Sequence, residues 1–162
     1  MSDVLGKLNL NDGPKDIVND AAFAAVPSAS LIFTVGEDDK NCSIDVEGVA
    51  TLTVLAMAGA GELHLDLRHT APDGTVTLLG APAAKGLTLA ATQGLAATNV
   101  PVALRHILEL DEGAHKLELV AKVSEAGTTV RLHAADAEWH LKLNVKRLQV
   151  MRDYFQSYTG SK

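Results

Sequence analysis

Residues 62–69 read Glu-Leu-His-Leu-Asp-Leu-Arg-His, and this stretch shows most clearly the pattern that decides the fold. Leu63, Leu65 and Leu67 alternate with polar residues. Successive side chains of a β-strand point to opposite faces, so the alternation predicts a strand with one buried and one solvated face. The Pro-Asp-Gly of residues 72–74 predicts a turn, and residues 75–79 predict the second strand of a hairpin.

The same period of two returns along most of the chain. Further strands are predicted at residues 31–35, 42–47, 51–57, 86–91, 100–110, 115–123, 129–134 and 138–148. Short strands at this spacing, separated by turns, are typical of a sandwich or barrel, and the lack of a long helical period argues against a parallel α/β sheet. We therefore predict an all-β fold, an antiparallel β-sandwich. Alternation alone does not separate a jelly roll from an immunoglobulin-like sandwich.

Two segments flank the predicted sandwich domain, which spans residues 31–150. Residues 1–30 are predicted to form an N-terminal arm, with a turn signal at residues 11–14 and a short helix between Asp16 and Ala25. Residues 151–162 form a predicted C-terminal tail. This tail holds three of the chain's aromatic residues, of which the whole sequence has one Trp, two Tyr and three Phe.

Size and charge exclude several classes of protein. A chain of 162 residues is about one domain's worth. Its 14 Lys and Arg against 20 Asp and Glu give a net charge of −6, so we expect neither nucleic acid nor an anionic membrane surface as a partner. Its first residues lack the features of a signal peptide, and residues 49–61, the longest weakly polar run, are too short to cross a bilayer. We expect a protein made in a cytoplasm.

One strand face carries a possible metal site. His64 and Asp66 lie two residues apart, with Arg68 and His69 beside them, and a His and an Asp at that spacing can begin a metal site. No third ligand is evident from the sequence. The favoured interpretation is therefore a solvated strand face with a weak Asp66–Arg68 pair.

Two other polar features also have a simpler interpretation. Glu37-Asp38-Asp39, with Asp45 nearby, suits calcium through loop carboxylates but does not match the EF-hand spacing, so a charged turn is favoured. The single cysteine, Cys42, excludes an internal disulfide and multi-cysteine zinc sites. It lies in phase with Ile44 and Val46, which predicts a small buried side chain.

No motif of nucleophilic or phosphate chemistry is present. The sequence has neither a Gly-x-Ser-x-Gly elbow nor a glycine-rich phosphate loop. The histidines are scattered at positions 64, 69, 106, 115, 133 and 140, whereas a cupin-like enzyme needs clustered metal ligands. We predict no catalytic residue, no metal, no cofactor and a non-enzymatic protein.

The C-terminal third has a characteristic order of strands. A long predicted strand is followed by Leu-Asp-Glu-Gly-Ala-His-Lys-Leu-Glu-Leu at residues 110–119, a Gly-containing turn, a short strand, and Trp-His-Leu-Lys-Leu-Asn-Val at residues 139–145. Over residues 31–148 this order resembles the tumour-necrosis-factor-like and complement-globular-head jelly rolls and their relatives in bacteriophage tail fibres and head proteins. The resemblance implies a homotrimeric jelly roll that binds, caps or decorates another structure, and it supplies no shared catalytic residues.

These observations predict a virion protein, most specifically a phage capsid decoration or stabilising protein that binds neighbouring subunits through its termini. Its expected partners are copies of itself, as a homotrimer, and a major capsid or other virion protein. The alternative is a tail-fibre, receptor-binding or carbohydrate-binding module, which would need exposed aromatic residues. The predicted contact residues are apolar or aromatic: Leu8, Leu10, Ile17 and Phe23 in the arm, and Tyr154, Phe155 and Tyr158 in the tail.

His106 is a separate candidate. It lies in phase with Leu104 and Leu108 on an apolar strand face. A histidine there is either a satisfied core or interface residue or a titrating group that switches an interface. In a trimer it would be a candidate for the symmetry axis.

Overall fold

The computed structural model describes residues 3–10, 15–17, 22–40, 42–56, 62–80, 87–90, 100–123, 129–132 and 141–148. Within these ranges the chain forms strands and no helix, and so no helix long and apolar enough to cross a membrane. The all-β prediction is confirmed. The strands are β1 (Val4–Leu10), β2 (Lys15–Ile17), β3 (Ala24–Val35), β4 (Ser43–Ala56), β5 (Glu62–Thr70), β6 (Val76–Leu78), β7 (Leu87–Ala90), β8 (Val100–Glu109), β9 (Gly113–Val123), β10 (Thr129–Leu132) and β11 (Leu141–Leu148).

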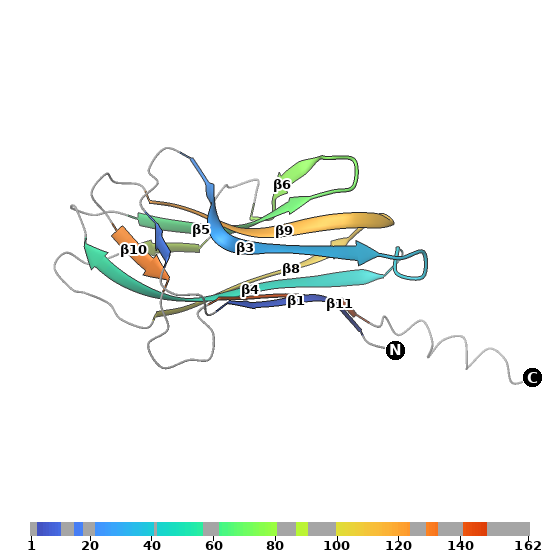
Figure 1. Cartoon of the computed structure of the whole chain (residues 1–162), viewed down its shortest axis with the longest axis horizontal. Helices are drawn as coiled ribbons and strands as arrows, with labels where there is room; N and C mark the ends of the chain where they lie inside the picture. Colours follow the sequence, from blue (N-terminus) through green and yellow to red (C-terminus); the bar gives the residue numbers. More distant parts are fainter. Residues whose placement is uncertain are drawn as a thin grey trace, which may run out of the picture.

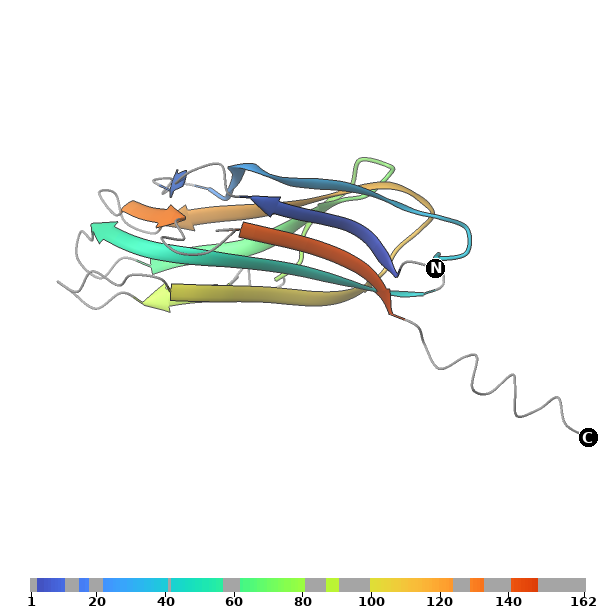
Figure 2. The same cartoon turned by 60° about the horizontal axis from the view of Figure 1, so that its bottom comes forward.

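The strands form two antiparallel sheets that pack face to face, as Figures 1 and 2 show. Sheet A has the order β1-β11-β4-β10-β2, with β8 on the other edge of β4, and sheet B has the order β3-β9-β5-β6, with β7 also on β5. Among the longer strands the first pairs with the last, β1 with β11. The pairs β3–β9 and β4–β8 then follow inward, and the short strands β6 and β7 both pair with β5. This nested pairing is that of a long hairpin rolled into a sandwich. The strand order is therefore that of a jelly roll and not of an immunoglobulin-like sandwich.

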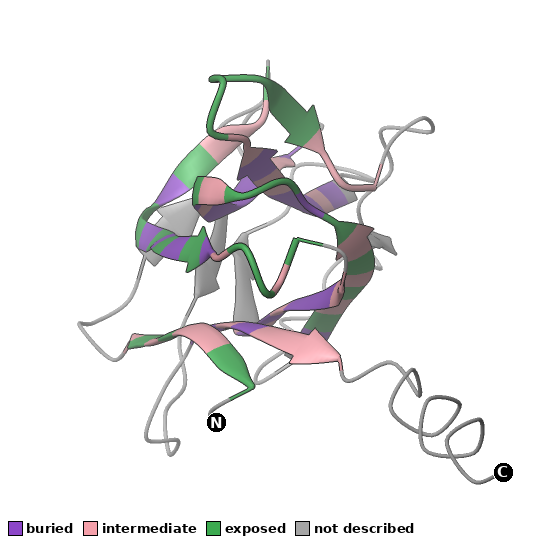
Figure 3. Cartoon of the chain, turned by 90° about the vertical axis from the view of Figure 1, so that its right-hand side faces the viewer, coloured by how far each residue is buried: buried purple, intermediate pink, exposed green. Residues whose placement is uncertain are grey.

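The core between the sheets is aliphatic and follows the predicted alternation. Leu63, Leu65 and Leu67 are buried, and Figure 3 shows buried residues alternating with exposed ones along the strands. Gly48 lies among the core-facing residues of β4, where an added Cβ would be 2.8 Å from Leu67 Cδ2. This glycine therefore lets the two sheets approach closely. Because β8 and β11 both pair with β4 across Gly48, the two strands predicted at 42–47 and 51–57 form one strand.

The N-terminal segment, predicted as an arm over residues 1–30, supplies strands in its described part. β1 pairs with β11 from Val4↔Lys146 to Leu10↔Leu141, and Leu8 and Leu10 pack against the core. The short helix predicted between Asp16 and Ala25 is wrong, because residues 15–17 form β2 and residues 24–25 begin β3. A signal for β1 was present in the alternation of residues 7–10, Lys-Leu-Asn-Leu.

Candidate functional site

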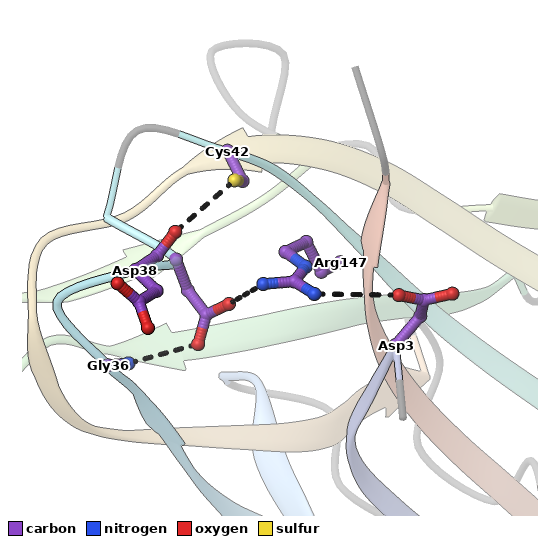
Figure 4. Close-up of polar contacts among 6 residues, drawn as sticks. Asp3, Gly36, Asp38, Cys42 and Arg147 are labelled. Atoms are coloured by element: carbon purple, nitrogen blue, oxygen red, sulfur yellow. Dashed lines mark hydrogen bonds and ion pairs between the residues drawn. The ribbon is translucent and has the colours of Figure 1, made fainter. Parts of the chain in front are cut away.

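One end of the sandwich is held together by Arg147, near the end of β11 (Figure 4). Its backbone N–H donates to the carbonyl oxygen of Asp3 at 2.6 Å. Its guanidinium Nη1 donates to Asp39 Oδ1 at 2.7 Å, and Nη2 lies 3.6 Å from Asp3 Oδ1. Asp39 also accepts a hydrogen bond from the N–H of Gly36 at 3.3 Å. We call Asp3, Asp39 and Arg147 the terminal clamp, because they join the start of β1, the β3–β4 loop and the end of β11.

The acidic loop does not gather its carboxylates around a common point. Asp39 faces Arg147, and Asp45 faces Arg105 on another strand. In the described part of the chain no group of three potential ligands is placed to hold a metal ion. The loop thus has the geometry of a charged turn. Cys42 is half-buried rather than fully buried, and its Sγ lies 3.7 Å from the carbonyl oxygen of Asp38.

The outer face of sheet A carries a buried carboxylate. Asp45 of β4 is only 2% exposed, because Arg105 of β8 covers it with two hydrogen bonds of 2.7 and 2.9 Å. Lys146 of β11 lies 3.5 Å away. The hydrogen bonds from Arg105 hold the pKa of Asp45 below its usual value. This bidentate pair fixes β8 to β4 from the outside.

On β5 the predicted Asp66–Arg68 pair is not formed. Asp66 is fully buried, and its carboxylate accepts hydrogen bonds from the backbone N–H groups of Leu67 at 2.7 Å and Gly80 at 2.9 Å. The expectation of a solvated face is wrong at this position, because the turn after β6 covers it. Arg68 instead donates to Glu118 on β9 at 3.0 Å.

Glu118 on β9 is a further buried carboxylate of sheet B. Lys116 Nζ lies 2.8 Å from its Oε1, while Arg68 Nε binds its Oε2. Burial alone would raise the pKa of Glu118, but the hydrogen bonds and charges of Lys116 and Arg68 outweigh it and lower the pKa. The strands β5 and β9 are thereby linked by an ion pair as well as by their backbone ladder.

Two histidines that the sequence did not connect meet in the core. His69 Nε2 lies 2.9 Å from His115 Nδ1, and His115 stacks between His69 and Phe33 at centroid distances of 5.1 and 5.4 Å. His115 Nε2 lies 2.8 Å from the carbonyl oxygen of Asp111, which only accepts, so this nitrogen carries the proton. The other nitrogen of His115, Nδ1, is then unprotonated and accepts a hydrogen bond from the Nε2–H of His69. Burial, followed by electrostatic repulsion from the neighbouring His115 ring when both rings are protonated, lowers the pKa of His69.

The predicted contact residues lie on several different elements. Leu8 and Leu10 face the chain's own core, and Ile17 lies on β2 opposite Val130 of β10. Phe23 is half-buried, with Lys122 Nζ 5.3 Å from its ring centroid.

His106 is half-buried on β8, opposite Val46 of β4. Tyr154, Phe155 and Tyr158 lie outside the described residues, and the trimer-axis role of His106 stays a prediction.

The sequence analysis missed an exposed apolar residue on β8. Ile107 is 59% exposed and has the opposite phase to Leu104, His106 and Leu108, which are half-buried. That phase was the available signal, since an isoleucine on the polar side of an alternating strand predicts exposed apolar surface. A single exposed apolar residue is common on protein surfaces and does not by itself indicate an interface.

No family model and no curated protein matches the sequence. Several solved structures are similar in shape. The CBM22-1 xylan-binding domain of Xyn10C from Paenibacillus barcinonensis has 12% identity and a TM-score of 0.36, with 92% of this chain and 97% of that chain covered. A structure of the infectious bursal disease virus Gt strain has 17% identity and a TM-score of 0.40, with 92% and 39% covered. Tailspike protein 4 of bacteriophage CBA120 has 9% identity and a TM-score of 0.30, with 91% and 20% covered. These weak similarities transfer no function to this chain.

Proposed function

We propose that this protein is a non-enzymatic structural protein of a virion, a capsid decoration or stabilising protein that binds a neighbouring subunit through its two termini. The terminal clamp is the observation that carries the proposal. The backbone hydrogen bond between Arg147 and Asp3 brings the two flanks of the jelly roll to one place. Asp3 and Leu148, the described residues nearest the two ends of the chain, therefore lie at the same end of the sandwich, which would let both termini engage the same partner.

The clamp also gives such contacts a rigid base. The side chains of Arg147 and Asp39 are 14% and 16% exposed, so the end of β11 is anchored against the β3–β4 loop, and the backbone hydrogen bond from Arg147 ties Asp3 to it. Fixing the attachment point lowers the entropy lost on binding. Tyr154, Phe155 and Tyr158 follow in the sequence, and aromatic residues are the common anchors of protein interfaces. A partner that binds only the folded chain stabilises it by mass action.

The test is the composition of purified virus particles from the source of the gene. We expect peptides of this chain in the particles in a fixed ratio to the major capsid protein. A variant that lacks residues 151–162 should be lost from the particles, whereas Val76→Ser, an exposed position on β6, should be retained. Absence of the chain from the particles, or full retention of the truncated variant, would contradict the proposal.

Carbohydrate binding is the second candidate, and the outer face of sheet A favours it. The strand register aligns Lys7, Asn144, Glu47 and Arg105 across four strands, and such side chains can hydrogen-bond sugar hydroxyls. The aromatic side chains whose burial is described, Phe23 and Phe33, are half-buried and buried. A glycan array separates the candidates: a specific hit that Glu47→Ala abolishes would support this second function.

A further inference from the structure

Strand β8 is a long edge strand of sheet A. It pairs with β4 in one continuous register, from Ser43↔Glu109 to Leu52↔Val100, and no other described strand pairs with it. Figure 2 shows β8 at the margin of the sheet. On such an edge, alternate backbone N–H and C=O groups point away from the sheet and can pair with a further strand. The ten residues of β8 therefore form a regular edge that is suited to pairing with another strand.

The side chains along β8 are complementary to a second copy of the same strand. Arg105, Ile107 and Glu109 are all exposed and follow each other at every second position on the outer face. If two β8 strands run antiparallel about a two-fold axis at Ile107, each Arg105 lies opposite the Glu109 of the other copy. The two Ile107 side chains then meet at the axis. Both opposite-charge pairs and apolar pairs stabilise adjacent strands.

Other registers lose this complementarity. A centre at Arg105 or at Glu109 places two like charges opposite each other, which is unfavourable. A centre at His106 places Ile107 opposite Arg105. A slip by one residue pairs outer-face with core-face side chains. The register centred on Ile107 is therefore the one in which the apolar and both charged positions match.

Arg105 retains the capacity for this second contact. Only two of its N–H groups bind Asp45, at 2.7 and 2.9 Å, and its side chain is 58% exposed. A guanidinium has five N–H donors, so others remain for the carboxylate of Glu109 in the second copy. On the core side, the same register places His106 opposite Leu108, next to the axis.

We propose that the protein forms a two-fold dimer by antiparallel pairing of β8 with β8 of a second copy, centred on Ile107. The two A sheets then form one continuous sheet with both outer faces on the same side. This assembly uses none of the terminal clamp residues, so it stands independently of the proposed function. It differs from the trimer that the family resemblance implies.

The first experiment is sedimentation velocity of the full chain over a concentration series. We expect the wild type to be a dimer, and Ile107→Lys or Glu109→Arg to raise the dimer dissociation constant at least about tenfold, because each places like charges at or beside the axis. Ile32→Lys is the matched control, since Ile32 is 73% exposed on the edge strand β3. It should leave the dimer intact. A monomeric or trimeric wild type, or equal effects of the β8 variants and Ile32→Lys, would overturn the proposal.

The second experiment reads the register directly and does not depend on disrupting the dimer. In a Cys42→Ser background, oxidation of Ile107→Cys should give a disulfide-linked dimer, because directly opposed residues have the Cα separation that a disulfide needs. Ala103→Cys, also exposed on the outer face, should not cross-link. Its two copies would be roughly 27 Å apart along the strands at 3.4 Å per residue. Cross-linking at residue 103 but not at residue 107 would exclude this register.

Discussion

The edge strands on the two sides of the sandwich are built differently. The pairing of β3 with β9 is interrupted between Ala25 and Ser30, where Pro27 cannot donate a hydrogen bond and Ser28 has a φ of 64°. The pairing of β1 with β11 also shifts, between Val4 and Gly6. By contrast, β8 keeps a single register along β4, and the proline in β8 lies near the strand's start. Bulges and prolines prevent edge-to-edge pairing, so the comparison shows one protected side and one regular side.

The two sides also differ in how their edge strands are anchored. On β3, Phe33 and Val35 are 3% and 0% exposed, and Gly6 of β1 lies so close that an added Cβ would be 3.1 Å from Phe33 Cβ. The residues on the core side of β8 beyond Val102, such as Leu104 and Leu108, are only half-buried. Close packing therefore closes the β1–β3 side, whereas the core-facing residues of β8 remain partly accessible.

The largest expected effect tests this difference in anchoring. Phe33→Ala should lower the free energy of unfolding by about 3–5 kcal/mol, because it leaves a cavity at a fully packed site. Leu104→Ala on β8 should cost only about 1 kcal/mol, since a half-buried side chain loses less apolar area. Urea denaturation of both variants, at a concentration where each is monomeric, measures the two values. Equal losses would contradict the idea that the edges are anchored differently.

Acidification should first destabilise the packing around Phe33, where His115 and His69 stack. It should affect the ion pair between Arg105 and Asp45 only at lower pH. The lowered pKa of His69 means that the folded state binds fewer protons than the unfolded chain below the usual histidine value of 6.5. Stability therefore falls as the pH drops through and below 6.5. Asp45 and Glu118 have lowered pKa values as well, so their contributions are lost only as the pH falls below about 4.

Thermal unfolding measured from pH 8 to pH 3 should thus show two separate declines. His69→Gln should flatten the first decline and leave the second in place. A first decline of unchanged size in this variant would show that the His69–His115 pair is not its source.

A smaller, local effect is expected at the terminal clamp. Arg147→Ala removes the guanidinium that bridges Asp3 and Asp39, so β1 should open more often from its start. Hydrogen exchange should become severalfold faster at the β1 amides and remain unchanged along β8. Arg68→Ala, which breaks a similar pair on sheet B, serves as the control. Faster exchange across both sheets would show that the clamp has a global role.

The smallest effect concerns the interruption in β3. Ser28→Gly should stabilise the protein by about 0.5 kcal/mol, because glycine adopts a positive φ without steric cost. Ser30→Gly, in the regular part of the same strand, should destabilise it by about as much. The pair of variants is compared by urea denaturation. A destabilising Ser28→Gly would mean that the left-handed conformation at Ser28 is not a source of strain.

Much of the fold could be predicted because the signal is local. The alternation in residues 62–69, 115–123 and 141–145 located β5, β9 and β11, since a strand with one buried face must place apolar residues at every second position. The same reasoning failed in the N-terminal segment. There, residues 15–17 are too few to show a period, and Pro27-Ser28 interrupts β3 and hides its start.

The polar contacts could not be predicted, because each joins residues that are distant in the sequence. Arg147 meets Asp39 across 108 positions, and Arg105 meets Asp45 across 60. The alternation placed Asp66 on a solvated face, but the turn after β6 buries it. The alternation of apolar and polar residues predicts on which face of a strand a side chain lies. It does not predict which other part of the chain covers that face.

The sequence by itself determined that this chain is an antiparallel β-sandwich, because the two-residue period is a property of each strand alone. Only the tertiary structure decided that β1 pairs with β11 and β4 with β8, which makes the sandwich a jelly roll. It also decided that β8 is a regular edge among the described strands and that Asp3 and Arg147 meet at one end of the sandwich. The physical reason is that strand order and register depend on which apolar faces pack together, and one alternating strand offers the same face to many possible neighbours.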